Sequence, residues 1–181
     1  MRGPRPVANY DTTASGTGAT MELLKLIALD KDDVAVISTH LQDAVVKIAD
    51  IAWLPAEKRI VIGLNRFDWE GANGGGRGYR RRRTALRFER ALCLKARNIS
   101  PQNQDAVLNL LAVAFAETDA PAGVITLIFS GGAALRLEVE CLEAELADLG
   151  PVWETKACPG HPDAGDLAPD LPVDAPHPPR H

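Results

Sequence analysis

The feature that most constrains the fold is a two-residue alternation of apolar and polar side chains, which recurs through the middle of the chain. It is clearest over residues 86–97, where the apolar positions are Leu86, Phe88, Leu92, Leu94 and Ala96. Side chains of a β-strand point alternately to opposite faces, so this spacing predicts a strand with one buried face. Arg90 interrupts the apolar face and predicts a bulge or a strand end there.

Other segments repeat the signal and define most of the expected sheet. The β-branched and apolar runs predict further strands over residues 24–29, 44–54, 59–67, 108–116, 124–129 and 135–139. Residues 55–58 and 130–133 are rich in turn-forming residues and join neighbouring strands as hairpins. About seven mostly antiparallel strands are therefore expected.

Two helices are expected beside these strands. Asp30 is a candidate N-cap with Asp33 three residues later, and apolar residues at helical spacing follow to about residue 42. Leu142, Leu146 and Leu149 predict a closing helix that ends at Gly150 and Pro151. We therefore predict an α+β fold in which a bent sheet or half-open barrel is capped by a C-terminal helix. This order resembles pleckstrin-homology-like domains, although the early helix departs from their pattern.

Proline and glycine content divides the chain of 181 residues. Eight of its 13 prolines lie in residues 151–181, and the first 20 residues lack any periodic apolar pattern. Such segments cannot bury enough apolar surface to offset the entropy of ordering. We predict a disordered leader over 1–20, with Met21 as the natural start, one globular domain over 21–153 and a proline-rich disordered tail over 154–181.

Composition excludes several classes of protein. The sequence has no apolar run of the roughly 18 residues that a membrane helix needs. Its three cysteines cannot form a disulfide framework, which favours a reducing compartment. We therefore expect a cytoplasmic protein that does not associate with a membrane.

Three stretches together carry a resemblance to a known family. They are residues 24–55, which begin LKLIALDKDD, residues 64–70 (LNRFDWE) and residues 129–153, which begin FSGGAALRLE. They resemble a family of small, uncharacterised bacterial proteins, mainly alphaproteobacterial, that is classed as a domain of unknown function. The resemblance implies a bacterial cytoplasmic setting and supports the limits of the domain, but it implies no activity and no site residues.

The four consecutive arginines Arg80, Arg81, Arg82 and Arg83 are the most conspicuous charged feature. Residues 66–97 hold ten basic and three acidic residues, although the whole chain has a formal net charge of −4. Such a patch attracts phosphate, and Tyr79 beside it could stack on an exposed base. The alternative is a solvated loop that enters an edge strand, whose charges discourage pairing with another chain.

Arg66, Asp68 and Trp69 form a second candidate cluster. Arg66 and Asp68 are two residues apart, so on a strand they share a face and can pair, while Trp69 takes the other face. One interpretation is an aromatic edge of the core with an exposed ion pair of little energetic value. The other is a binding surface, since Trp and Arg dominate interface hot spots.

Catalysis and cofactor binding have little support in the sequence. The glycine-rich segment 71–78 lacks nucleotide-binding spacing, and Cys158, His161, His177 and His181 lie in the proline-rich tail without a second cysteine pair. Cys141 with His40 is the remaining candidate for a nucleophile and its base. We expect no cofactor and no metal. The leading hypothesis is a small non-enzymatic binding or adaptor domain that contacts a protein partner, and the alternative is a binder of nucleic acid or another polyanion.

Overall fold

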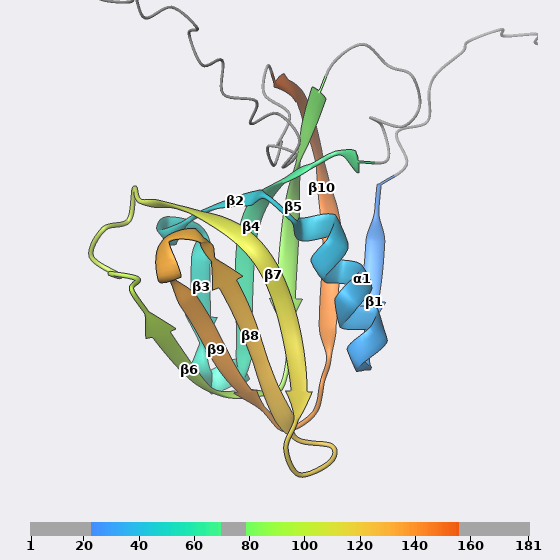
Figure 1. Ribbon diagram of the computed structural model, residues 1–181, viewed down its shortest axis with the longest axis vertical. Helices are drawn as coiled ribbons and strands as arrows, with labels where there is room; N and C mark the ends of the chain where they lie inside the picture. Colours follow the sequence, from blue (N-terminus) through green and yellow to red (C-terminus); the bar gives the residue numbers. More distant parts are fainter. Residues whose placement is uncertain (1–22, 70–78, 156–181) are drawn as a thin grey trace, which may run out of the picture.

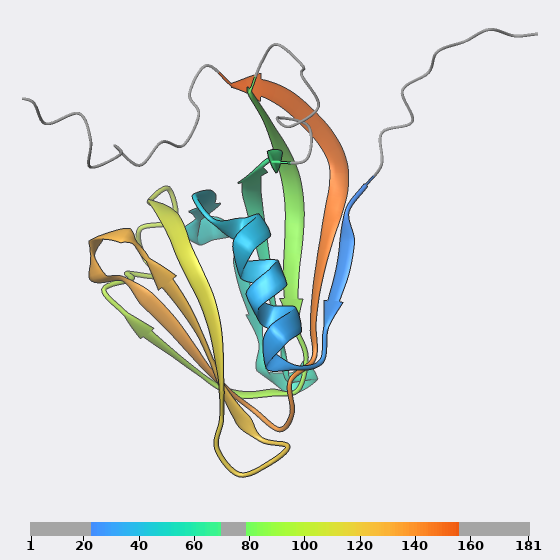
Figure 2. The same cartoon turned by 45° about the vertical axis from the view of Figure 1, so that its right-hand side comes forward.

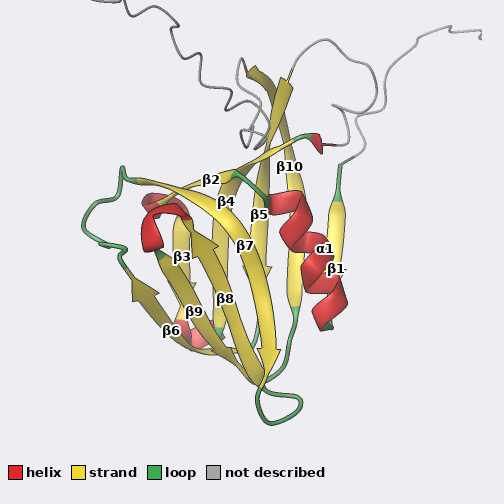
Figure 3. Ribbon diagram, in the orientation of Figure 1, coloured by secondary structure: helices red, strands yellow, loops and turns green. Residues whose placement is uncertain are grey.

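The computed structural model describes residues 23–69 and 79–155, which form ten strands and one α-helix (Figures 1 and 3). The helix is α1 (Lys31–Leu41). The strands are β1 (Lys25–Ala28), β2 (Ala44–Lys47), β3 (Ile51–Leu54), β4 (Arg59–Phe67), β5 (Tyr79–Phe88), β6 (Ala91–Arg97), β7 (Val107–Glu117), β8 (Gly123–Phe129), β9 (Ala134–Val139) and β10 (Ala144–Thr155).

All ten strands belong to one open antiparallel sheet. Its order is β1-β10-β5-β4-β2-β7-β8-β9-β6. Strand β3 pairs with the first half of β4, and β2 pairs with β4 near its end. The sheet is bent so that two arms face one another, and α1 lies between β7 and β1 in the opening (Figure 2). The α+β class and the mostly antiparallel sheet are confirmed, with more strands than the seven predicted.

Helix α1 begins as its sequence predicts. The backbone N–H of Asp33 donates to Oδ1 of Asp30 at 2.9 Å, and Oδ2 of Asp33 accepts from the backbone N–H of Leu29 at 3.0 Å. The first bond satisfies a backbone donor of the first helical turn, which lacks a partner within the helix, and the second fixes the residue that precedes the N-cap. Val34, Ile37 and Leu41 are buried against the inner face of the sheet, so α1 closes one side of the core.

The predicted closing helix is wrong: residues 144–155 form strand β10. The leucines at 142, 146 and 149 suggested a helical stripe, but the buried positions are Leu142, Ala144, Leu146 and Asp148. That is the two-residue period of a strand, while Leu149 is 55% exposed. The sequence does not show this alternation clearly, because the fourth inward position is Asp148 and not an apolar residue. The likeness to pleckstrin-homology-like domains rested on this helix, and α1 instead occupies the opening of the sheet.

Two long predicted strands are each divided. Residues 44–54 form β2 and β3, separated by a short 3-10 turn at Ile48–Asp50. The predicted strand at 86–97 ends at Arg90, as expected, because Arg90 has a φ of 55° and connects β5 to β6. The predicted leader and most of the predicted tail lie outside the described residues.

Candidate functional site

Arg66 is the centre of a buried polar cluster on the inner face of β4, β5 and β10. Its Nε and Nη2 donate to the two carboxylate oxygens of Asp148 at 2.9 and 2.8 Å. The hydroxyl of Thr84 donates to the same carboxylate at 2.8 Å, and the backbone N–H of Leu24 donates at 3.0 Å. The side chains of Arg66 and Asp148 are each 1% exposed. This bidentate pair therefore joins three strands and the start of β1 inside the core.

The surroundings of Asp148 set its ionisation. Burial alone raises the pKa of a carboxyl group, but the hydrogen bonds from Arg66, Thr84 and Leu24 outweigh that effect and lower the pKa of Asp148 below its ordinary value. Asp148 is thus held as a carboxylate opposite the Arg66 guanidinium. Asp148 was not predicted as a site residue. The one signal in the sequence was that it continues the two-residue period of positions 142, 144 and 146.

Asp68 lies beside this cluster and is also buried. Its Oδ2 is 3.0 Å from Nη2 of Arg82, and the Asp68 side chain is 1% exposed. The rings of Phe67 and Trp69 have centroids 4.4 Å apart and are tilted by 57°. Strand β4 ends at Phe67, so Asp68 and Trp69 follow the strand, and both Arg66 and Asp68 are buried and do not form an exposed pair. In this arrangement neither side chain is presented to a partner.

The four arginines lie in β5, which pairs with β4 on one side and β10 on the other. They therefore do not form a loop entering an edge strand. Nη1 of Arg81 donates to the backbone carbonyls of Asp43 and Asn65, and Nη2 of Arg83 lies 3.0 Å from Oδ2 of Asp50. Arg80 is exposed. Tyr79 begins β5, but its side chain and the glycine-rich segment 71–78 lie outside the described part.

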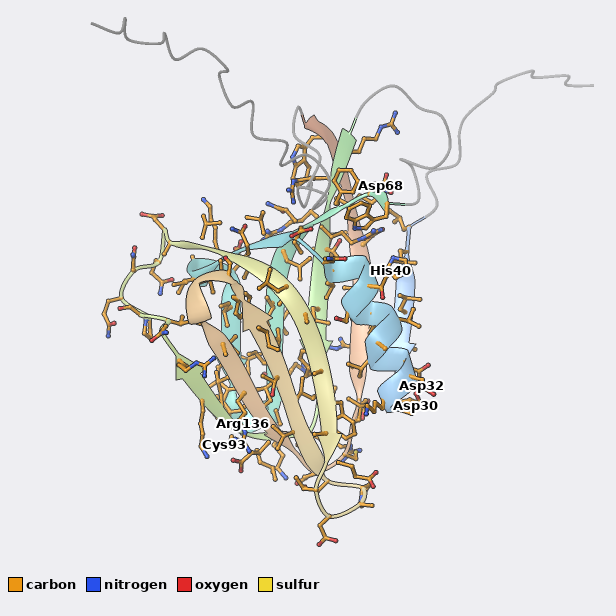
Figure 4. All side chains as sticks on the ribbon, in the orientation of Figure 1. Asp30, Asp32, His40, Asp68, Cys93 and Arg136 are labelled. Atoms are coloured by element: carbon orange, nitrogen blue, oxygen red, sulfur yellow. The ribbon has the colours of Figure 1, made fainter. Side chains whose placement is uncertain are left out.

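Cys141 and His40 are not brought together. Cys141 lines a cavity of about 420 Å³ with Asp30 and Lys31 at the N-terminal end of α1. His40 lies nine residues further along the helix, which corresponds to about 14 Å at 1.5 Å per residue. Figure 4 shows Asp30 and His40 near opposite ends of α1. A nucleophile and its base need hydrogen-bond contact, so these residues do not form such a pair.

Within residues 23–69 and 79–155, no three His, Cys, Asp or Glu side chains are placed to hold a metal ion. The candidate metal ligands of the tail lie outside these ranges. No helix of the described ranges combines the length and apolar character needed to cross a membrane.

Two further cavities differ in charge balance. The first, of about 400 Å³, is lined by charged side chains that already pair with one another, including Arg59 with Glu89 at 2.8 Å and Lys58 with Glu140. It therefore has little attraction left for a charged ligand. The second, of about 610 Å³, lies on the outer face of the other arm and has three cations and no carboxylate in its lining.

We call this second cavity the basic groove. Its cations are Lys95 and Arg97 of β6 and Arg136 of β9, and its floor includes Val124, Thr126 and Ile128 of β8. Strand pairing places Lys95 opposite Arg136, and Arg136 opposite Thr126. Figure 4 shows Cys93 and Arg136 together at one end of this arm, away from Asp68 and His40. The basic groove is thus separate from the buried polar cluster.

Comparison with known proteins identifies the family of the chain. A family model described as "Protein of unknown function (DUF2948)" matches residues 24–161. The chain belongs to this family. The match confirms membership of a family of unknown function, as predicted. No curated protein and no solved structure matches the chain.

The charges of the basic groove are only partly compensated in this DUF2948 member. Nζ of Lys95 donates to Oε1 of Glu138 at 2.9 Å, and this hydrogen bond raises the pKa of Lys95 and lowers that of Glu138. Nε of Arg97 donates to the backbone carbonyl of Gly132 at 3.1 Å. Arg136 forms no salt bridge with any residue in the described ranges. The basic groove can therefore attract carboxylate or phosphate groups over an apolar floor.

Proposed function

We propose that the protein is a non-enzymatic binding module that takes an acidic segment of a protein partner into the basic groove. The observation that carries this proposal is the groove itself: three cations surround a partly apolar floor, and no carboxylate lines it. Its volume of about 610 Å³ lies within the range typical of ligand sites.

Charge and shape both favour a protein segment as the occupant. Lys95, Arg97 and Arg136 are exposed side chains that offer hydrogen-bond donors to carboxylates. Ile128 is 40% exposed beside them and offers apolar contact area. A segment with both acidic and apolar side chains uses both features, whereas a small inorganic anion uses the cations alone.

Selection from a library of random peptides tests this proposal. The immobilised full chain should enrich peptides with an excess of Asp and Glu, and Arg97→Glu/Arg136→Glu should abolish that enrichment. Lys31→Glu/Lys47→Glu, which changes two exposed lysines elsewhere and alters the net charge equally, should retain it. The proposal is overturned if no peptides are enriched, if the enriched peptides lack excess acid, or if the groove variant selects the same peptides.

A second candidate function is binding of single-stranded nucleic acid through β5 and β10. The specific observation in its favour is Trp153, which is 39% exposed and pairs with Arg81 in the strand register. An exposed indole beside guanidinium groups offers a stacking platform for a base. Against it, Arg81, Arg82 and Arg83 already contact carboxylate or carbonyl oxygens, which reduces the charge available to phosphate.

Binding of a labelled poly(U) oligonucleotide at low salt tests this second candidate. Trp153→Ala and Arg80→Ala should each weaken binding severalfold if bases stack on this face, while Arg97→Glu/Arg136→Glu should weaken it less. If the wild-type protein does not bind the oligonucleotide, or both single variants bind as well as the wild type, the second candidate is wrong.

A further inference from the structure

Strand β6 is the final strand of the sheet and borders the basic groove. Within the described ranges it pairs with β9 on one side and with no strand on the other (Figure 1). Its first residue is anchored, because the backbone N–H of Ala91 donates to the carbonyl of Lys58 at 2.8 Å. The edge is therefore open from Leu92 onward and presents backbone groups that pair readily with an extended chain.

The two faces of this edge differ sharply in character. On the outer face Lys95 and Arg97 are exposed beside the basic groove. On the inner face Leu94 is partly buried against the core, and Ala96 next to it is exposed. Leu94 and Ala96 pair with Leu137 and Leu135 of β9, both fully inside the core. The open edge thus presents the partly buried Leu94 and the exposed Ala96 on its inner face, and a pair of cations on its outer face.

We infer that the acidic segment binds by adding an eleventh strand to β6, with acidic and apolar side chains at alternate positions. This inference rests on the proposed function and specifies how its partner is recognised. The acidic side chains lie opposite Lys95 and Arg97, and the apolar side chains cover Leu94 and Ala96. Cross-strand pairs of opposite charge favour this register, and main-chain hydrogen bonds between β6 and the added strand supply the rest of the affinity.

The same charges disfavour a second copy of the chain as the occupant of this edge. Antiparallel pairing of β6 with itself places Lys95 and Arg97 close to the same cations of the other copy. Like charges directly opposite in a sheet are destabilising. Cations on an edge strand discourage self-association, and here they leave the edge selective for an acidic strand.

Fluorescence anisotropy with defined peptides tests the inference. The first peptide is a labelled 12-residue alternation of Glu and Val, and the second has the same composition in the order Glu-Glu-Val-Val. We expect the full chain to bind the alternating peptide at least tenfold more tightly. Two derivatives of the alternating peptide are then compared, one N-methylated at every Glu and the other at every Val. In an extended strand these two sets of N–H groups point to opposite sides.

One N-methylated peptide should lose binding and the other should keep it, because only one side of an added strand faces β6. As a charge control, Lys95→Glu/Arg97→Glu should lose the Glu-Val peptide and gain affinity for the corresponding Lys-Val peptide. If both N-methylated peptides bind equally well, or if both orders of Glu and Val bind alike, strand addition is wrong while the proposed function stands. If neither acidic peptide binds, or binding is unchanged in Lys95→Glu/Arg97→Glu, the proposed function fails as well.

Discussion

Replacing Asp148 with asparagine should destabilise the fold strongly, because it leaves a buried guanidinium without its carboxylate. Asp148 accepts two bonds from Arg66, at 2.9 and 2.8 Å, and one each from Thr84 and Leu24. Asparagine has nearly the same shape but no charge, and it replaces one of the two accepting oxygens with an NH2 group that donates. Breaking a buried ion pair on one side costs about 3–5 kcal/mol. We expect Asp148→Asn to lower the free energy of unfolding by that amount.

A double-mutant cycle separates the pair from its surroundings. Arg66→Met leaves the Asp148 carboxylate buried without its cation, so it should also cost about 3–5 kcal/mol. If the two costs were independent, Arg66→Met/Asp148→Asn would lose about 6–10 kcal/mol. Each single variant leaves one buried charge without its partner, whereas the double variant leaves none. We therefore expect the double variant to lose no more free energy of unfolding than either single variant.

Urea unfolding followed by circular dichroism measures these differences in the free energy of unfolding, provided that its slope against urea concentration is the same in every variant. Asp119→Asn, in an exposed turn, is the matched control and should change the free energy of unfolding by less than about 0.5 kcal/mol. The reasoning is refuted if Asp148→Asn costs less than about 1 kcal/mol, or if the two single costs add in the double variant.

Three further predictions follow from the same packing. The pKa of Asp148 is lower in the folded protein than in the unfolded chain, where it is about 3.9. Its carboxylate therefore stabilises the fold above that unfolded pKa, and this stabilisation is lost as pH falls through the lower folded pKa. Acid unfolding followed by fluorescence should show that Asp148→Asn lacks this pH-dependent part of the stability. Leu146→Ala should cost about 2–5 kcal/mol in urea unfolding and Leu149→Ala less than about 0.5, since a strand buries only the first; equal costs would favour a helix. Gly123→Ala should lower the free energy of unfolding by about 1–3 kcal/mol, because the added Cβ would lie 2.4 Å from the Phe115 ring, and an unchanged urea midpoint would contradict that clash.

The parts of the fold that could be predicted are those whose signals are local. The N-cap of α1 depends on Asp30 and Asp33, which lie three residues apart, and the structure shows the bond between them. The end of the 86–97 alternation at Arg90 is equally local.

The parts that could not be predicted depend on partners far apart in the chain. Burial of Arg66 requires Asp148, which is 82 residues away and is brought opposite it only when β10 pairs with β5. Without that pairing, an aspartate among leucines indicates a solvated helix face. The error over residues 144–155 and the expectation of an exposed ion pair at Arg66 therefore have one cause: each half of the buried pair was interpreted without the other.

Charge density along the sequence and charge density in space also differ in this protein. The basic excess over residues 66–97 is most concentrated at Arg80–Arg83, but folding brings Asp68 to Arg82 and Asp50 to Arg83. The lining of the basic groove instead combines Lys95 and Arg97 with Arg136 of β9, which lies about 40 residues further along the chain. No carboxylate lines this groove. Binding of a polyanion to the arginines of β5 should therefore depend on Arg80, whereas binding of an acidic segment to the basic groove should depend on Arg97 and Arg136. Comparing Arg80→Ala with Arg97→Glu/Arg136→Glu against both probes separates the two functions.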